Sequence, residues 1–257
     1  MSHIPPLDPN VAARKGFRES EERLKRFWKA VDVVEGEGAQ GTFWAVALDG
    51  RTPKTPAHAP LRLPTEAAAR LAADEWAAQG EFIDPATMPA TRLAATAIDR
   101  VSQVREAVAE EIAAFAGSDL LCYLAEHPTS LAVEQAREWT PWRDWAAIEL
   151  GVHLEPAEGI VHRPQDPAAI ARVADLALRL DDFALTGLAM AVPLLGSAVL
   201  ALAVQRGVLA GEAAFELSRL DEAFQERQWG VDAEAAERTA ARRAEAALLD
   251  RWFRALG

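Results

Sequence analysis

The stretch Gly36–Gly41 has the spacing G-x-G-x-x-G, the pattern in this chain most directly associated with phosphate binding. In a dinucleotide-binding fold the third glycine opens a helix whose N-terminus holds the pyrophosphate, but here the flanking segments favour strands. A kinase-type loop does join two strands, yet Leu48 stands where its phosphate-pairing lysine would follow. A flexible hairpin loop is the simpler interpretation. An adenine-nucleotide-binding enzyme that uses this hairpin stays as the alternative.

The other residue types that carry chemistry show no catalytic or metal-binding spacing. The five histidines, His3, His58, His127, His153 and His162, form no H-E-x-x-H pattern, and no G-x-S-x-G is present. The single cysteine, Cys122, lies in an apolar context that is typical of a buried small hydrophobe. We therefore predict no catalytic residue, no bound metal and no cofactor.

Composition narrows the classes of partner. The 257 residues include 27 basic and 39 acidic side chains, which gives a net charge of −12. Nucleic-acid binding needs a basic footprint, so this balance argues against it. The N-terminus lacks the basic start and apolar run of a signal peptide, and we expect residues 1–25 to be a flexible segment.

One apolar run is long enough to cross a membrane. Phe183–Val204 contains no charged residue, but it is rich in alanine and has no flanking aromatic belt. A helix that is apolar on all sides is also typical of a buried central helix. We predict a single buried helix here and no stable membrane insertion.

The N-terminal quarter favours strands. Phe27–Val34 and Thr42–Leu48 are rich in aromatic and β-branched residues, and Asp49-Gly50 is a strong turn signal. Arg51–Thr55 would return antiparallel, and Leu61–Leu63 adds a short last strand. We predict a small antiparallel β domain over residues 26–64.

After Pro64 the chain favours helices. The predicted helices span residues 66–79, 89–100, 103–116, 128–150, 167–180, 182–205, 210–229 and 233–255. Thr65 is placed to cap the first of them, and Thr140-Pro141 predicts a kink or a restart within the fourth. The fold class is therefore α+β and mostly α, with a helical domain over residues 65–257.

The stretch 209–232 predicts one amphipathic helix with a surface that is unusual for a purely structural element. Ala213, Leu217, Leu220 and Phe224 recur at helical spacing as an apolar stripe, and Gly230 ends the helix. Polar and aromatic side chains occupy the other faces. Either Phe215 and Trp229 pack under neighbouring elements and the polar side chains are solvated, or the helix presents a surface that another protein binds. The candidate partner-binding residues are Phe215, Arg219, Asp221, Glu222, Gln225 and Trp229, together with Trp76 from the first helix.

Several motifs share their order with a known family. Ser218–Gly230 resembles the S-R-L-E-x-x-[FY]-Q-x-x-x-W-G signature of the assembly chaperones that attend the α subunit of F-type ATP synthase. Further matching segments are Arg26–Val31, Leu48–Pro56, Asp74–Gln79, Met88–Asp99, Asp119–Tyr123 and Glu138–Trp145. The likeness covers roughly residues 26–240, and the chain departs from it after Gly230, where relatives carry further aromatic and histidine residues.

The resemblance implies a soluble, non-catalytic chaperone. Such a protein holds newly made α subunit, covers the surface meant for the β subunit and gives way when β arrives. It implies a cytoplasmic location in a bacterium and the mitochondrial matrix for eukaryotic relatives. Composition and periodicity alone indicate only an acidic protein of two parts, with no cofactor and a helix of mixed polarity.

Overall fold

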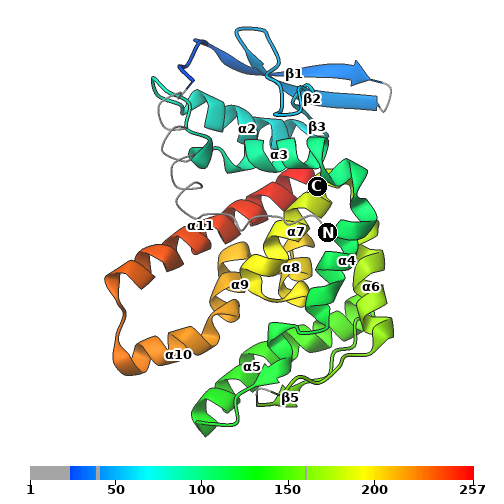
Figure 1. The fold of residues 1–257 in the computed structure, drawn as a ribbon, viewed down its shortest axis with the longest axis vertical. Coiled ribbons are helices and arrows are strands. Elements are labelled where there is room, and N and C mark those ends of the chain that lie inside the picture. Colours follow the sequence, from blue (N-terminus) through cyan, green and yellow to red (C-terminus); the bar gives the residue numbers. More distant parts are fainter. Residues whose placement is uncertain (1–23, 39–40, 160) are drawn as a thin grey trace, which may run out of the picture.

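The computed structural model describes residues 24–38, 41–159 and 161–257 (Figure 1). Three strands come first: β1 (Val31–Gly38), β2 (Gly41–Leu48) and β3 (Arg62–Leu63). The helices are α2 (Glu66–Ala77), α3 (Pro89–Asp99), α4 (Arg105–Ala116), α5 (Thr129–Trp145), α6 (Pro167–Leu178), α7 (Asp182–Leu195), α8 (Ala198–Gln205), α9 (Gly211–Ser218), α10 (Leu220–Trp229) and α11 (Ala233–Leu256). The predicted class, mostly helical with a small N-terminal antiparallel sheet, is confirmed. Residues 1–23 of the predicted flexible segment lie outside the described residues.

The sheet is antiparallel, as predicted, and its order is β1-β2-β3. The predicted return strand over Arg51–Thr55 is wrong, because this segment makes only isolated bridges, from Arg51 to Leu48 and from Lys54 to Pro60, and β3 pairs with β2 instead. β1 begins at Val31, four residues later than predicted, because the backbone N–H groups of Lys29 and Ala30 donate to the carboxylate of Asp49 instead of extending the strand. These two amide hydrogen bonds hold the pKa of Asp49 below its usual value. Asp49 and Gly50 both have positive φ, which makes the tight turn after β2 that the sequence predicts.

The first glycine of the G-x-G-x-x-G pattern has a packing reason. A Cβ added at Gly36 would lie 2.5 Å from Cζ of Phe43, so the ring of Phe43 occupies the space that a side chain would need. The guanidinium carbon of Arg62 lies 4.0 Å from the centre of the same ring. Gly36 therefore leaves the space that the ring of Phe43 occupies.

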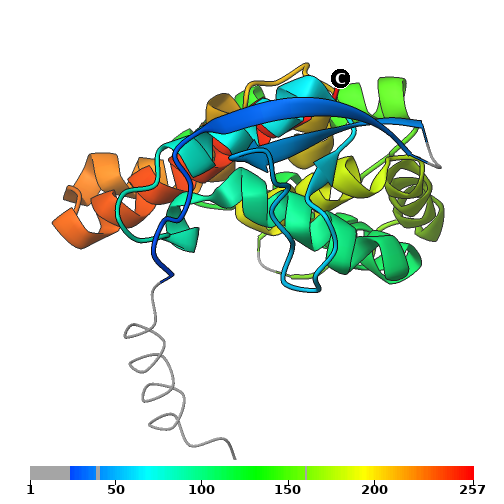
Figure 2. The ribbon, with the colours of Figure 1, turned by 90° about the horizontal axis from the view of Figure 1, so that it is seen from above.

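Helix α2 lies under the sheet and links it to the helices (Figures 1 and 2). Its buried residues are all alanines, which allows the sheet and the helix to approach closely. Thr65 caps it as predicted, accepting from the N–H of Ala68 at 3.1 Å. The same hydroxyl donates to the carbonyl of Ala255 at 2.6 Å, which joins the start of α2 to the end of the chain.

The segment between α2 and α3 is held by one side chain of α2, Glu75, and by Gln79, which lies just after the helix. The carboxylate of Glu75 accepts from the N–H groups of Ala90 and Thr91, at 2.6 and 2.8 Å, and so caps α3 from outside it. The buried amide of Gln79 accepts from Asp84 N–H at 2.6 Å and donates to the Thr87 hydroxyl at 3.0 Å. Glu75 and Gln79 belong to the same short motif as Trp76, so this motif has a structural role.

The sheet and the helices share one continuous core. A single cluster of buried side chains runs from Trp28 and Val46 on the sheet side to Trp252 and Phe253 at the end of α11. The division at residue 64 into a β domain and a helical domain stays a prediction.

The predicted helix over residues 182–205 is wrong in one respect, because it is two helices. Gly196 adopts a left-handed conformation with φ of 63° after α7, and Ser197 caps α8 by accepting from Leu200 N–H. The predicted burial is confirmed, since nine of the 14 residues of α7 and seven of the eight residues of α8 are buried. In the described residues, no helix has both the length and the apolar character that a membrane crossing requires.

Helix α5 runs through Pro141 without a break. Of the two predicted alternatives at Thr140-Pro141 the restart is therefore wrong, and the kink stays a prediction. The regular helix ends only at Trp145, where a π-helical turn over Ala146–Leu150 follows. The indole N–H of Trp139, which is fully buried, donates to the carbonyl of Leu217 at 3.0 Å. The rings of Trp142 and Trp145 meet edge to face, with 6.1 Å between their centres, and both are partly buried. These aromatic side chains therefore pack against the core.

Asp119 is a fully buried carboxylate that joins two segments far apart in the sequence. It accepts from Leu121 N–H at 3.1 Å and from Val199 N–H, in the first turn of α8, at 3.2 Å. Burial raises the pKa of Asp119 to about 6, against the lowering effect of the Ser197 hydroxyl and the backbone amides. Burial likewise raises the pKa of the neighbouring Cys122 thiol to about 12. The buried position of Cys122 matches the prediction of a small buried hydrophobe.

Asp119 predicts a specific pH dependence of stability. Because its pKa is higher in the folded chain than in the unfolded chain, this group stabilises the fold at low pH, and that contribution is lost as the pH rises through about 6. Relative to Asp119→Asn, the free energy of unfolding of the wild type should therefore rise by about 2 kcal/mol between pH 8 and pH 4.

Urea unfolding of dilute protein across this pH range measures the difference. Asp166→Asn is the control, because Asp166 also caps a helix, accepting from Ala168 N–H at 2.8 Å, but is exposed. Parallel curves for the wild type and Asp119→Asn would show that Asp119 does not titrate in this way.

Candidate partner-binding surface

The predicted single helix over residues 209–232 is wrong, because it breaks at Arg219 into α9 and α10. Two contacts in different directions explain the break. At its start α9 lies so close to α11 that a Cβ added at Gly211 would be 2.1 Å from the carbonyl oxygen of Ala246. Just after the break, α10 is hydrogen-bonded to α5 through Asp221. The break therefore lies between two contacts that α9 and α10 make with different helices.

The break also changes which side chains face the core. Ala213 of the predicted apolar stripe is exposed, whereas Ala214, Phe215 and Leu220 are buried. Phe215 is only 3% exposed and belongs to the central core cluster. Its role in partner binding stays untested, but in this conformation its ring is not available to another protein.

Asp221 is directed inward, toward α5. Its Oδ1 accepts from Nε2 of Gln135 at 2.6 Å, and Oε1 of the fully buried Gln135 accepts from Ala125 N–H at 2.7 Å. Burial raises the pKa of Asp221, and the Gln135 hydrogen bond opposes that shift. The pair therefore fixes where α10 lies on the body of the molecule.

Two arginines of this region are engaged in ion pairs. Arg219 at the break is mostly buried and pairs with Glu226, one turn from the end of α10. Arg227 reaches across to Glu134 of α5, with 2.6 Å between Nη2 and Oε2. Arg219 therefore stabilises the angle between α9 and α10, and Arg227 reinforces the attachment that Asp221 makes.

The remaining candidates form an exposed face of α10. Glu222, Gln225 and Trp229 follow at spacings of three and four residues, so they lie on one side of the helix, and all three are exposed. Trp229 is 81% exposed, and the exposed Val231 follows it at the turn into α11. A large aromatic and a valine at the tip of a projecting helical pair form an apolar contact point (Figure 1).

The first half of α11 completes this projection. From Ala233 to Ala244 it has no buried side chain, and alanines alternate with charged residues. Sequence reasoning predicted the helix but not its exposure. The sequence does contain a signal for this exposure, because Ala233–Ala244 has no leucine, isoleucine, valine or aromatic residue that could form a core face. We refer to α10 and Ala233–Ala244 together as the arm.

Trp76 lies far from the arm, on α2 beside the sheet (Figure 1). It is partly buried, and its ring meets that of Trp28 edge to face at 5.0 Å. The guanidinium carbon of Arg26 lies 5.3 Å from the Trp28 ring centre on this aromatic cluster. The structure therefore brings Glu222, Gln225 and Trp229 together and leaves Trp76 in a separate place.

Comparison with known proteins agrees with this arrangement. A family model described as ATP12 chaperone protein matches residues 25–147. The crystal structure of Atp12 from Paracoccus denitrificans is 42% identical, covers 91% of this chain and 98% of its own, and superposes with a TM-score of 0.84. The chain belongs to the ATP12 chaperone family. This membership confirms the resemblance found in the sequence and the prediction of a non-catalytic chaperone.

Two further structures extend the comparison. A single-residue variant of the Paracoccus protein matches with the same identity and TM-score. An Agrobacterium tumefaciens protein described as a chaperone is 39% identical, covers 97% of this chain and 92% of its own, and also has a TM-score of 0.84. The similarity to these structures therefore includes the arm of this ATP12 chaperone as well as its sheet.

The two differently placed tryptophans make a matched test of stability. Trp76→Arg should lower the free energy of unfolding by about 3 kcal/mol or more, because it removes a packed aromatic and places a cation beside Arg26. Trp229→Arg should change it by no more than about 0.5 kcal/mol, since Trp229 is exposed.

Thermal melting and soluble yield of both variants check this prediction. If Trp76→Arg melts like the wild type but no longer binds its partner, Trp76 is a contact residue rather than a structural one.

Proposed function

We propose that this chaperone binds the α subunit of F-type ATP synthase through the arm and assists assembly of the catalytic head. The exposed face formed by Glu222, Gln225 and Trp229 is the observation that carries the proposal. It lies within the Ser218–Gly230 signature that the chain shares with chaperones of that subunit. The related structures come from bacteria, in which the catalytic head faces the cytoplasm, so we place the protein there.

The arm suits this task because its attachment and its contact face use different residues. Asp221 and Arg227 bind α5, and Arg219 fixes the angle with α9. Trp229 supplies a large apolar surface at low conformational cost, and neighbouring polar groups exclude water around it. A client subunit can therefore dock on the face without disturbing the contacts that hold the arm.

The two adjacent acids of α10 should behave differently when their charge is reversed. Glu222→Lys should leave the free energy of unfolding within about 0.5 kcal/mol of wild type, because Glu222 is exposed, and should reduce recovery of soluble α subunit on co-expression. Asp221→Lys should lower stability by about 2 kcal/mol or more, because Gln135 loses its buried acceptor.

Glu110→Lys on α4 is the matched control, since it reverses an equally exposed acid away from the arm. If Glu222→Lys and Trp229→Ala both recover as much soluble α subunit as the wild type does, this face is not the binding surface.

A further inference from the structure

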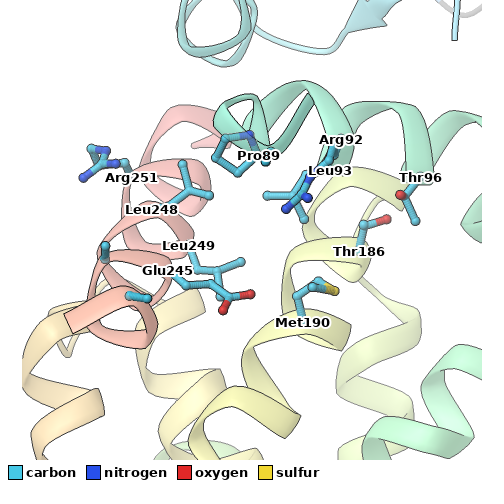
Figure 3. A pocket seen from close by; sticks show the side chains of 13 residues that line it. Pro89, Arg92, Leu93, Thr96, Thr186, Met190, Glu245, Leu248, Leu249 and Arg251 are labelled. Carbon is cyan, nitrogen blue, oxygen red and sulfur yellow. The ribbon is translucent and has the colours of Figure 1, made fainter. Parts of the chain in front are cut away.

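A second surface lies on the body of the molecule, where α3, α7 and α11 enclose a pocket of about 690 Å³ (Figure 3). Leu93 of α3 and Leu248 and Leu249 of α11 supply apolar walls, and Met190 of α7 lies on the side facing them. Met190 is 43% exposed, although most of α7 around it is buried. An unbranched, polarisable methionine in an open pocket is typical of surfaces that accept varied apolar groups.

Three charged residues line this pocket, Arg92 on α3 and Glu245 and Arg251 on α11, and the Arg251 side chain is directed away from Met190 (Figure 3). Arg92 descends from α3, and Glu245 extends from α11 toward Met190 (Figure 3). Neither side chain makes a hydrogen bond or an ion pair with any residue that the structure describes. A partner that covers Arg92 and Glu245 removes water from their charges, and burying an unpaired charge costs free energy. The partner must therefore supply groups that pair with them. Its complementary surface therefore carries an acid, a base and an apolar group.

The backbone of the occupant is constrained as well. The lining comes from α3, α7, α11 and the short turn before α3, so no strand edge offers N–H and C=O groups to an extended chain. A segment that enters must satisfy its own backbone hydrogen bonds, which a helix does. A helix laid in an apolar groove is a common mode of recognition. Small residues of α11, Ala241 and Ala244, permit a close approach at the base of the arm, where the pocket and the arm meet.

We infer that this groove binds an amphipathic helix of the client chain, with an acidic group against Arg92, a basic group against Glu245 and an apolar side chain on Met190. The inference rests on the proposed function, because the client supplies the helix. A second copy of this protein is disfavoured, since two chains with a net charge of −12 repel each other. The client is thus held at two places, by the arm and by the groove.

Photo-crosslinking identifies the occupant directly. A benzoylphenylalanine in place of Met190 in the full-length chain, co-expressed and purified with the α subunit, should crosslink to one helical peptide of that subunit that carries charges of both signs. The same group in place of Ile148, which is 79% exposed on another face, should not. Crosslinks only to residues 1–23 of the same chain, only to a second copy, or to nothing in a complex that forms normally would each overturn the inference.

The two charges are tested by substitution. Arg92→Glu and Glu245→Lys should each weaken retention of α subunit at least about tenfold, and Arg92→Lys should change it less than about twofold. Arg100→Glu, an exposed arginine at the end of the same helix, is the matched control. Melting of every variant verifies the fold. Unchanged retention by both reversed variants would contradict the charge assignment, whereas a wild type that retains no α subunit would overturn the proposed function itself.

Discussion

The close approach of α11 to α7 is the contact on which the rest of the molecule depends. Trp252 and Phe253 lie against Gly187, where an added Cβ would be 2.9 and 2.8 Å from their rings. The indole N–H of Trp252 donates to the carbonyl of Phe183 at 3.1 Å. These contacts bury the last turns of α11 in the core. Because the helix is rigid, its first half must then extend beyond the body, which creates the arm.

The arm is a second consequence of that geometry. Ala233–Ala244 has no core to face, so its composition is free to be alanine and charge, and α10, which precedes it in the chain, is attached to α5. The Asp221–Gln135 hydrogen bond and the Arg227–Glu134 ion pair attach α10 to α5, and both lie on the inward side. The outward side keeps Trp229 and Glu222 available, while the groove beside the anchored half of α11 remains open.

Local signals in the sequence predicted the elements well, and long-range contacts explain what they missed. Thr65 and the Asp49-Gly50 turn were identified because a cap and a turn depend on neighbouring residues. The break at Arg219 was missed because α10 is directed by Gln135, which lies 86 positions from Asp221 in the sequence. The break at Gly196 was hidden within an uncharged run. The candidate face was found in part, since periodicity placed Glu222, Gln225 and Trp229 on the helix but could not tell that Phe215 turns inward.

The hydroxyl of Thr65 carries a consequence for the order of folding. It both caps α2 and donates to Ala255, two residues from the last residue of the chain, across a separation of 190 positions. Domains usually fold as the chain leaves the ribosome, beginning at the N-terminus. Here α2 can make this contact only after α11 has been synthesised, because the two residues are far apart in the sequence. The hydrogen bond is therefore a late event in folding, and it joins the helix that lies under the sheet to the last helix.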